Sequence, residues 1–480
     1  MEYIQKLLEK LGKEKVHRED FVRYAYAMDW SPRTIDEVFL PDVVVRPTST
    51  EDVVSIVKIG YEHNVPIVAG GGLTGMAGGA IAKYGGIYID TTTMNKVIEI
   101  DEENQVLRAQ AGITLQEIND ALEKHRLWLP NLPESKWACT LGATIACDND
   151  STFGLKYGKI LHSLLSAKFV TGTGDVIEVG HRKVHFSSSG YKLLHLLAGS
   201  EGTLGIITEA TVKAQPIPEY RRVEMFLFKR MKDGIKFLSE LLANGLSIEG
   251  AHINCKRRVR FYTRAYKEKY GKEPRIPEWV EALLILIFAG KKEFVDFQFN
   301  YAFESSKRYN AELVEEREIV ESWWTSKHTL NFEPYKQKWA LSQKEKKFGA
   351  CDPGVPMGNL EKAYELFIKT AEKYKLEPIG MNAYLEHPNS IGLSLSCAVY
   401  VDYRNSNEVK NFRKYHEEMA KIAVDLGGTM STYMGDSDLK ADYLEYEHCS
   451  ATKYMKELKK IFDPKGIMNP GKKFNLSSFQ

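Results

Sequence analysis

A glycine-rich stretch directly after a short apolar run constrains the fold of this chain more than any other feature. Val65–Ala69 has the composition of a buried strand, and Gly70–Gly79 follows it with six glycines in ten residues. Glycine adopts positive φ and lets the backbone approach closely, so successive N–H groups of such a loop can point at an anion. The stretch therefore predicts a phosphate-binding loop more strongly than a plain turn between two strands.

Two familiar phosphate-binding motifs do not fit this loop. It lacks the lysine of the GxxxxGK[ST] motif. Gly70, Gly72 and Gly75 match a GxGxxG spacing, but no long helix opens before Gly85. The loop is therefore not interpreted as part of a Rossmann fold.

The pattern of apolar residues predicts a two-domain α+β chain. The 480 residues exceed what one small core can bury. Residues 1–40 are predicted as a helical lead-in, and β-rich runs with two hairpins follow, up to Pro216 and Pro218. The predicted domains are 1–217, then 218–440 as one sheet with helices on one face, then a returning segment, 441–480. The main expected elements are helices at 52–64, 114–125, 231–244, 359–374 and 407–426 and strands at 65–69, 86–90, 205–214, 223–228, 283–289 and 391–403.

Charge and cysteine content exclude several classes of protein. A formal net charge of +1 gives no overall attraction to nucleic acid. The six cysteines form no CxxC pair, which argues against an iron–sulfur cluster or a structural zinc. The sequence shows no signal peptide and no apolar run long enough to span a membrane. A cytoplasmic location is expected, and attachment to a membrane surface stays open.

A second glycine motif makes the first one far more specific. Gly190–Leu193 and Leu197–Thr208 read GYKL and LAGSEGTLGIIT. Together with the 70–79 loop, they resemble the FAD-linked oxidase family of the p-cresol methylhydroxylase and vanillyl-alcohol oxidase type. That family includes D-lactate dehydrogenases, glycolate oxidase flavin subunits and alkyl-dihydroxyacetonephosphate synthases. The resemblance extends over most of the chain and implies an FAD-binding domain followed by a substrate, or cap, domain.

The resemblance implies where FAD binds. The first glycine loop would hold the pyrophosphate, while residues 133–149, the second motif and the NPGK segment at 469–472 would lie along the rest of the cofactor. Gly70 and Leu73 depart from the residues that family members often carry at these loop positions. Because the loop contains neither histidine nor cysteine, FAD is expected to be non-covalent. The implied FAD-binding residues are Gly70, Gly71, Gly72, Leu73, Thr74, Gly75, Met76, Gly78, Pro133, Glu134, Thr140, Gly142, Ala143, Ala146, Glu201, Gly202, Gly205, Ile206, Ile207 and Asn469.

The sequence departs from relatives that bind a divalent metal beside the substrate. His387 stands at the position of their first histidine ligand, but Ser394 occupies that of the second. Tyr433 replaces the glutamate of their later glycine-rich segment. One histidine without partners is a poor metal site, so no metal is expected.

The leading candidates for catalysis are Tyr433, His387, Lys327 and His328, and Lys336 and Lys338 are further candidates. For Tyr433, a packed tyrosine and a substrate-binding hydroxyl agree equally well with the sequence. For His387, an ordinary loop histidine is the favoured interpretation. For Lys327 and His328, solvated charges on a helix are favoured. Three arginines, Arg257, Arg258 and Arg260, could meet an anionic substrate, although a surface patch is the favoured interpretation.

The expected function is an FAD-dependent oxidoreductase acting on an alcohol or a 2-hydroxy acid such as D-lactate or glycolate. Hydride would pass to flavin N5 while a protein base takes the hydroxyl proton. The expected partners are a small-molecule substrate and an external electron acceptor, which could be oxygen, a quinone, a cytochrome or a ferredoxin-like subunit. A homodimer is allowed. The alternatives are a non-redox FAD transferase resembling alkyl-dihydroxyacetonephosphate synthase and the flavin subunit of an electron-transfer complex.

Overall fold

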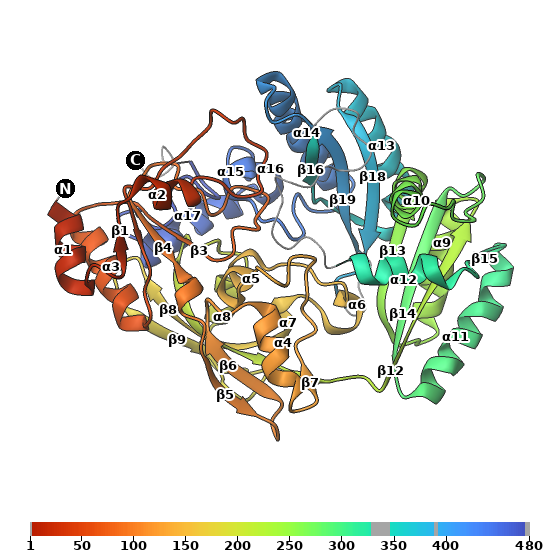
Figure 1. The fold of residues 1–480 in the computed structure, drawn as a ribbon, viewed down its shortest axis with the longest axis horizontal. Helices are drawn as coiled ribbons and strands as arrows, with labels where there is room; N and C mark the ends of the chain where they lie inside the picture. Colours follow the sequence, from red (N-terminus) through yellow and green to blue (C-terminus); the bar gives the residue numbers. More distant parts are fainter. Residues whose placement is uncertain (1, 328–345, 388–391, 476–480) are drawn as a thin grey trace.

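A computed structural model of the chain describes residues 2–327, 346–387 and 392–475. Two lobes lie side by side in Figure 1, one built from the N-terminal half and one from strands in the second half. We call them the N-terminal lobe and the cap lobe. The C-terminal helices, drawn in blue, return to the N-terminal lobe.

Two sheets form the N-terminal lobe. The smaller one has the order β1-β2-β4-β3, with β2, β4 and β3 parallel. The larger one is antiparallel, in the order β5-β6-β10-β8-β9. The strands are β1 (Val16–His17), β2 (Val43–Val45), β3 (Ile67–Gly70), β4 (Ile87–Asp90), β5 (Val97–Asp101), β6 (Val106–Gln110), β8 (Leu164–Thr171), β9 (Val176–Gly180) and β10 (Gly205–Lys213), with a separate pair, β7 (Leu127–Trp128) and β11 (Gln215–Pro216).

Helices of this lobe begin where the sequence supplies caps. The helix α3 (Thr50–Glu62) is capped by Ser49, whose side chain accepts from the Asp52 N–H at 3.2 Å. A capping box of Thr114 and Glu117 opens α4 (Leu115–Glu123). The other helices of the lobe are α1 (Glu2–Leu11), α2 (Asp20–Ala25), α5 (Leu141–Cys147), α6 (Gly154–Tyr157), α7 (Ile160–Ser163) and α8 (Leu193–Leu197).

The predicted lead-in over residues 1–40 is only partly helical. α1 and α2 are separated by β1, which pairs with β2, and residues 26–40 form turns and extended backbone. An amphipathic pattern marks α1, whereas α2 is short and buries no residue. The predicted helical lead-in is therefore confirmed over α1 and α2 and was wrong over residues 12–19 and 26–40.

One antiparallel eight-stranded sheet forms the cap lobe. Its order is β15-β12-β14-β13-β18-β19-β16, and β17 also pairs with β19. The strands are β12 (Tyr220–Phe228), β13 (Ile248–Cys255), β14 (Ala282–Gly290), β15 (Glu312–Leu313), β16 (Lys347–Cys351), β17 (Gly354–Pro356), β18 (Glu377–Tyr384) and β19 (Gly392–Val401). The helices are α9 (Met231–Ala243), α10 (Lys256–Tyr270), α11 (Lys292–Ser306), α12 (Arg317–Ser326), α13 (Leu360–Lys373) and α14 (Ser406–Asp425).

Helices cover both faces of this sheet, contrary to the expectation of one covered face. Phe226 and Phe228 pack with α9, α11, α13 and α14 in one core. Met225 and Leu227 point the other way and join a core that includes Val259 of α10, Val320 of α12 and much of the N-terminal lobe. Because β12 is apolar on both sides here, one layer of helices cannot bury it.

A cap-lobe arginine and aromatic rings of the N-terminal lobe hold the lobes together. The Arg221 guanidinium donates to both oxygens of Glu249, at 2.6 and 2.9 Å. The same guanidinium lies 5.0 and 5.1 Å from the ring centroids of Trp128 and Phe153. Glu249 is fully buried and holds the guanidinium in place within the cap lobe. The contact of that guanidinium with the two rings joins the cap lobe to residues 128–153.

The C-terminal segment lies beside the strand that precedes the glycine loop. It comprises α15 (Ser437–Lys440), α16 (Glu445–His448), α17 (Ala451–Phe462) and the residues that follow. The Ile67 N–H donates to Ile467 O, and the Asn469 N–H donates to Ile67 O, both at 2.8 Å. This pairing brings the NPGK segment to β3. The domain limits at 217 and 440 stay predictions.

Candidate active site

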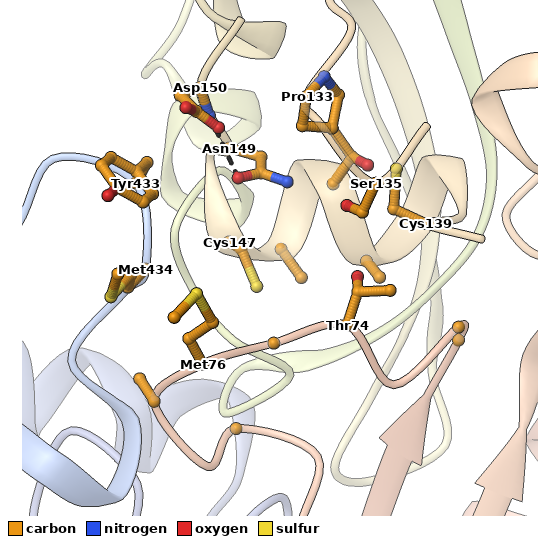
Figure 2. Close-up of a pocket in the computed structure, with 18 of the residues that line it drawn as sticks. Thr74, Met76, Pro133, Ser135, Cys139, Cys147, Asn149, Asp150, Tyr433 and Met434 are labelled. Atoms are coloured by element: carbon orange, nitrogen blue, oxygen red, sulfur yellow. Dashed lines mark hydrogen bonds between the residues drawn. The ribbon is translucent and has the colours of Figure 1, made fainter. Parts of the chain in front are cut away.

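A cavity of about 530 Å³ lies where the two lobes meet. Its N-terminal wall is formed by the 69–80 loop, residues 133–152 and the second glycine motif, and its cap wall by β13, β18, β19 and the segment that carries Tyr433. In Figure 2, Tyr433 and Met434 lie at the left, Met76 of the glycine loop lies below, and Cys147 and the rest of the 133–150 segment lie in the middle, at the top and at the right. The volume is typical of a small-molecule site.

The first three loop glycines allow the protein to pack against itself. A Cβ at Gly71 would lie 2.2 Å from Thr140 Oγ1, and one at Gly72 would lie 1.9 Å from the Ala138 carbonyl oxygen. Any larger residue would push β3 away from residues 138–140. Close backbone approach is therefore the reason for these glycines.

Two other glycines leave room for a ligand. Beside Gly75 and Gly202, the nearest atom to an added Cβ lies 4.0 Å away, and both residues line the cavity. Gly202 also has a φ of +70°, which favours glycine. The loop around Gly75 and the second motif thus form an open cradle that fits an extended ligand with phosphate groups.

All but three of the implied FAD-binding residues line this cavity. The exceptions support its wall. Thr140 packs against Gly71, and Gly78 turns the loop with a φ of +86°. The Asn469 amide donates to Gly79 O at 2.9 Å and to Glu201 O at 2.7 Å, which ties the two glycine motifs to the C-terminal segment.

Polar residues on three neighbouring strands form the cap wall. His252 of β13 lies opposite Tyr384 of β18, and Asn382 lies opposite Ser396 of β19. His252, Asn382, Tyr384 and Ser396 all line the cavity. Alternate residues of a strand share one face, so Asn254, two residues after His252 in β13, lies on the same face. It is buried and is the cross-strand partner of Asn382, so the polar patch continues there. The cap sheet therefore presents a polar area toward the cavity.

His252 is held neutral in this patch. Its Nε2 lies 3.3 Å from the Thr152 carbonyl oxygen, and its ring contacts Trp323 and Tyr384 at centroid distances of 5.4 and 5.6 Å. Burial and the nearby Lys327 lower the His252 pKa to about 4. Because a carbonyl only accepts, Nε2 carries the proton and Nδ1 keeps its lone pair.

Two tyrosines and a carboxyl group lie next to it. The Tyr384 hydroxyl donates to Asp150 Oδ2 at 2.9 Å, and burial raises the Asp150 pKa above its usual range. Tyr433 lies 6.0 Å from Tyr384 between ring centroids. Burial and the charges of Asp352 and Asp150 raise the Tyr433 pKa well above its usual value, so its hydroxyl stays protonated. Tyr433 can therefore donate a hydrogen bond to a ligand oxygen, whereas the Tyr384 proton is already donated to Asp150 and Tyr384 can only accept.

Basic groups complete the site, and one of them corrects the sequence interpretation. Arg258 is only 9% exposed and lines the cavity, so a surface patch was the wrong interpretation for this residue. Its neighbours Arg257 and Arg260 are exposed. The reason is helical geometry: Arg258 lies in the first turn of α10, where its backbone packs against Gly380 of β18.

Lys327 and Glu134 also line the cavity. The Lys327 ammonium is buried 4.5 Å from the Phe153 ring centroid and 4.3 Å from that of Trp324, so it is not a solvated helix charge. Burial and Arg221 lower its pKa well below the usual value. The Glu134 side chain lines the cavity and is exposed to it, while desolvation by the surrounding protein raises its pKa to about 7, against the opposing effect of Arg258.

The remaining catalytic candidates lie elsewhere. His387 is exposed, with its ring 4.4 Å from that of His162, and it is not among the described residues that line the cavity. His328, Lys336 and Lys338 lie outside the described residues. A catalytic role for any of them stays a prediction. Within residues 2–327, 346–387 and 392–475, no three histidine, cysteine or acidic side chains are grouped as metal ligands.

Sequence reasoning missed His252 and Asp150. His252 lies in β13, whose sequence IEGAHINC contains glycine and polar residues and lacks a clear strand pattern. Asp150 follows α5 in the stretch Asp148–Asp150, DND, which resembles a surface turn. The only available signal was that this stretch continues the 133–149 segment already assigned to the cofactor.

Comparison with known proteins finds a matching family for each half of the chain. Residues 41–180 match the FAD binding domain family, and residues 217–473 match the C-terminal domain of FAD linked oxidases. The glycolate oxidase subunit GlcD of Bacillus subtilis is 29% identical over 471 residues, which cover 98% of this chain and 96% of that protein. A D-lactate dehydrogenase of Archaeoglobus fulgidus is 29% identical over 432 residues, 90% of each chain.

Solved structures confirm the expected fold. A p-cresol methylhydroxylase superposes with a TM-score of 0.81 at 18% identity, covering 99% of this chain and 97% of its own. An alkyldihydroxyacetonephosphate synthase gives 0.75 at 22% identity, covering 98% and 85%. In the described part of the chain, no helix is both long and apolar enough to cross a membrane. The chain has the p-cresol methylhydroxylase-type fold, binds FAD, and belongs to the family of FAD-linked oxidoreductases.

Proposed function

We propose that this enzyme oxidises a 2-hydroxy acid, or a closely related alcohol. When bound, FAD supplies the hydride acceptor at its N5 atom. The observation that carries the proposal is the cap wall, where a neutral imidazole lies in the same cavity as the basic side chains of Arg258 and Lys327. Such a wall suits a molecule that has both a carboxylate and a hydroxyl group.

Arg258 and Lys327 are proposed to bind the substrate carboxylate. An arginine fork matches a carboxylate with two parallel hydrogen bonds. Lys327 is destabilised as a cation by burial and by Arg221, so an arriving carboxylate brings the compensating charge and raises its pKa. The site therefore favours an anionic substrate over a neutral alcohol of the same shape.

His252 is proposed as the base that takes the hydroxyl proton, at Nδ1. Its pKa of about 4 is low for this task, and Lys327 is one of the causes. A carboxylate beside Lys327 cancels that repulsion, so substrate binding itself raises the basicity of His252. Tyr433 is proposed to donate its hydroxyl proton to the same oxygen. Tyr384 donates its own proton to Asp150, so it is proposed only to accept the hydrogen bond of a substrate hydroxyl.

FAD is proposed to be held without a covalent bond. Cys139 and Cys147 line the cavity, but burial raises the pKa of each thiol to about 12. A protonated thiol is a poor nucleophile, so neither side chain is activated for attachment to the flavin. The residues proposed to hold the cofactor are those of the open cradle around Gly75 and Gly202, together with the segments that flank them.

The reduced flavin needs an external electron acceptor. Oxygen, a quinone, a cytochrome and a ferredoxin-like subunit all remain candidates, and a homodimer stays a prediction. One relative is named as a subunit of glycolate oxidase, which supports a larger assembly as the setting in which this chain acts.

Anaerobic mixing of the FAD-loaded protein with single candidate substrates tests the proposal. We expect D-lactate, glycolate or a related 2-hydroxy acid to bleach the visible flavin band, and the matching 2-hydroxy amide to do so far more slowly. Failure of every 2-hydroxy acid, with bleaching by neutral alcohols alone, would contradict it. A non-redox transferase would instead leave the flavin oxidised with all of them.

A further inference from the structure

We propose that Asp352 is a positioning residue, which fixes the backbone of Tyr433 over the cavity without contacting the substrate. The inference rests on the proposed role of Tyr433 at the substrate oxygen. Asp352 follows β16 in the cap lobe, and its side chain is fully buried. It is not among the described residues that line the cavity, whereas Tyr433 and Met434 are.

One carboxylate oxygen organises the whole turn that carries Tyr433. Asp352 Oδ2 accepts the backbone N–H groups of Thr432, Tyr433 and Met434, at 2.9, 2.9 and 2.7 Å. It also accepts the Ser431 hydroxyl at 2.8 Å. Three successive amides that converge on one anion fix the backbone direction of the middle residue, because each bond restricts the peptide plane on one side of it.

The other carboxylate oxygen anchors the same turn from its far end. Asp352 Oδ1 pairs with Lys440 Nζ at 2.8 Å, and both side chains are fully buried. The Lys440 ammonium also donates to Gly435 O at 2.7 Å. Despite its burial, the Asp352 pKa is held below its usual range, first of all by Lys440. Asp352 therefore stays ionised, which suits a carboxylate that accepts hydrogen bonds from three backbone N–H groups.

The segment is held on the cofactor side as well. Glu201, in the second glycine motif, accepts the Asp436 N–H at 2.8 Å and pairs with Lys473 at 3.0 Å; it also accepts the Ser437 hydroxyl. Residues 431–437 are therefore clamped by Asp352 of the cap lobe at one end and by Glu201 of the N-terminal lobe at the other. Tyr433 lies between the clamps, so its position depends on both lobes.

This arrangement assigns different roles to the two residues. The Tyr433 hydroxyl would contact the substrate, and Asp352 would hold the backbone that sets where this hydroxyl lies. Replacing Asp352 with asparagine keeps the shape but leaves an amide oxygen that attracts three N–H groups less strongly, and it leaves Lys440 without its counter-charge. The double variant Asp352→Asn/Lys440→Met removes that stranded charge and separates loss of positioning from loss of folding.

The test combines amide hydrogen exchange with kinetics on the FAD-loaded protein. We expect exchange in peptides covering residues 431–436 to become at least tenfold faster in both Asp352 variants. Exchange in peptides from β14 should stay unchanged. With a substrate, kcat should fall about tenfold or more, while KM changes less than threefold, because the carboxylate site at Arg258 is intact. Asp402→Asn, which removes another cap-lobe carboxylate paired with Arg404, is the matched control and should change neither readout.

Several results would overturn the proposal. Unchanged exchange at 431–436, or faster exchange with unchanged kcat, would show that Asp352 does not position Tyr433. Unfolding or loss of FAD in both the single and the double variant would assign Asp352 to folding instead. The exchange experiment needs no substrate. If the parent flavin is not reduced by hydroxy acids but exchange still rises, the proposed function fails and the assignment of Asp352 to the turn stands.

Discussion

Replacing Arg258 with methionine tests how the cavity selects its substrate. Methionine keeps an unbranched apolar side chain of comparable length, so packing against Gly380 and β18 is preserved while the guanidinium is lost. A hydrogen bond to a charged group contributes about 1.5–3 kcal/mol. At about 1.4 kcal/mol per factor of ten, the expected loss in kcat/KM for a 2-hydroxy acid is roughly 10- to 150-fold.

The lower part of this range is expected, because Lys327 lies in the same wall and still attracts the carboxylate. The assay is flavin reduction in stopped flow, with a 2-hydroxy acid and its amide compared at equal concentration. Arg257→Met is the matched control, since Arg257 precedes Arg258 on α10 but is exposed. Equal losses for the acid and the amide, or no loss for the acid, would refute the assignment of Arg258 to the carboxylate.

Four further predictions concern the same site. Tyr433→Phe should slow flavin reduction by about 10- to 1000-fold while FAD content is unchanged, as measured in single turnovers; an unchanged rate would make Tyr433 a packing residue. Acid precipitation should leave a colourless pellet and release FAD, and a chelator should leave turnover unchanged; a yellow pellet, or activity lost and then restored by one metal, would contradict this pair. The Glu134 pKa of about 7 means that its carboxyl is neutral below pH 7 and negative above it. KM for an acid substrate should therefore rise above pH 7, and Glu134→Gln should flatten that rise; an identical profile in the variant would reject the role of Glu134.

The sequence predicted the N-terminal lobe well because local rules act there. In the loop at 70–79, Gly71 and Gly72 stand where the chain packs closely against residues 138–140. The start of α3 at its N-cap, Ser49, follows from a local hydrogen-bonding pattern. The hairpins at β5–β6 and β8–β9 appeared as apolar runs around short polar turns. Such signals lie within a few residues of each other along the chain and need no tertiary information.

The cap wall of the cavity could not be predicted in the same way. His252, Tyr384 and Ser396 meet because β13, β18 and β19 are neighbours in the sheet, although they are far apart in sequence. Strand order and register decide which polar residues face the cavity, and a single sequence specifies neither one reliably. Arg258 shows the same limit: three arginines in four residues look equivalent until the orientation of α10 buries the middle one.

The most direct test of the account is single-turnover reduction of the enzyme flavin, without oxygen, by a 2-hydroxy acid carrying deuterium at C2. The account predicts that the acid bleaches the flavin band and that deuterium slows bleaching several-fold, because the bond to that hydrogen breaks as hydride leaves. The slowing should persist in Arg258→Met at saturating acid, since that variant changes binding and not the bond being broken. Reduction at the same rate with hydrogen and deuterium, or no reduction by any 2-hydroxy acid, would contradict the central claim.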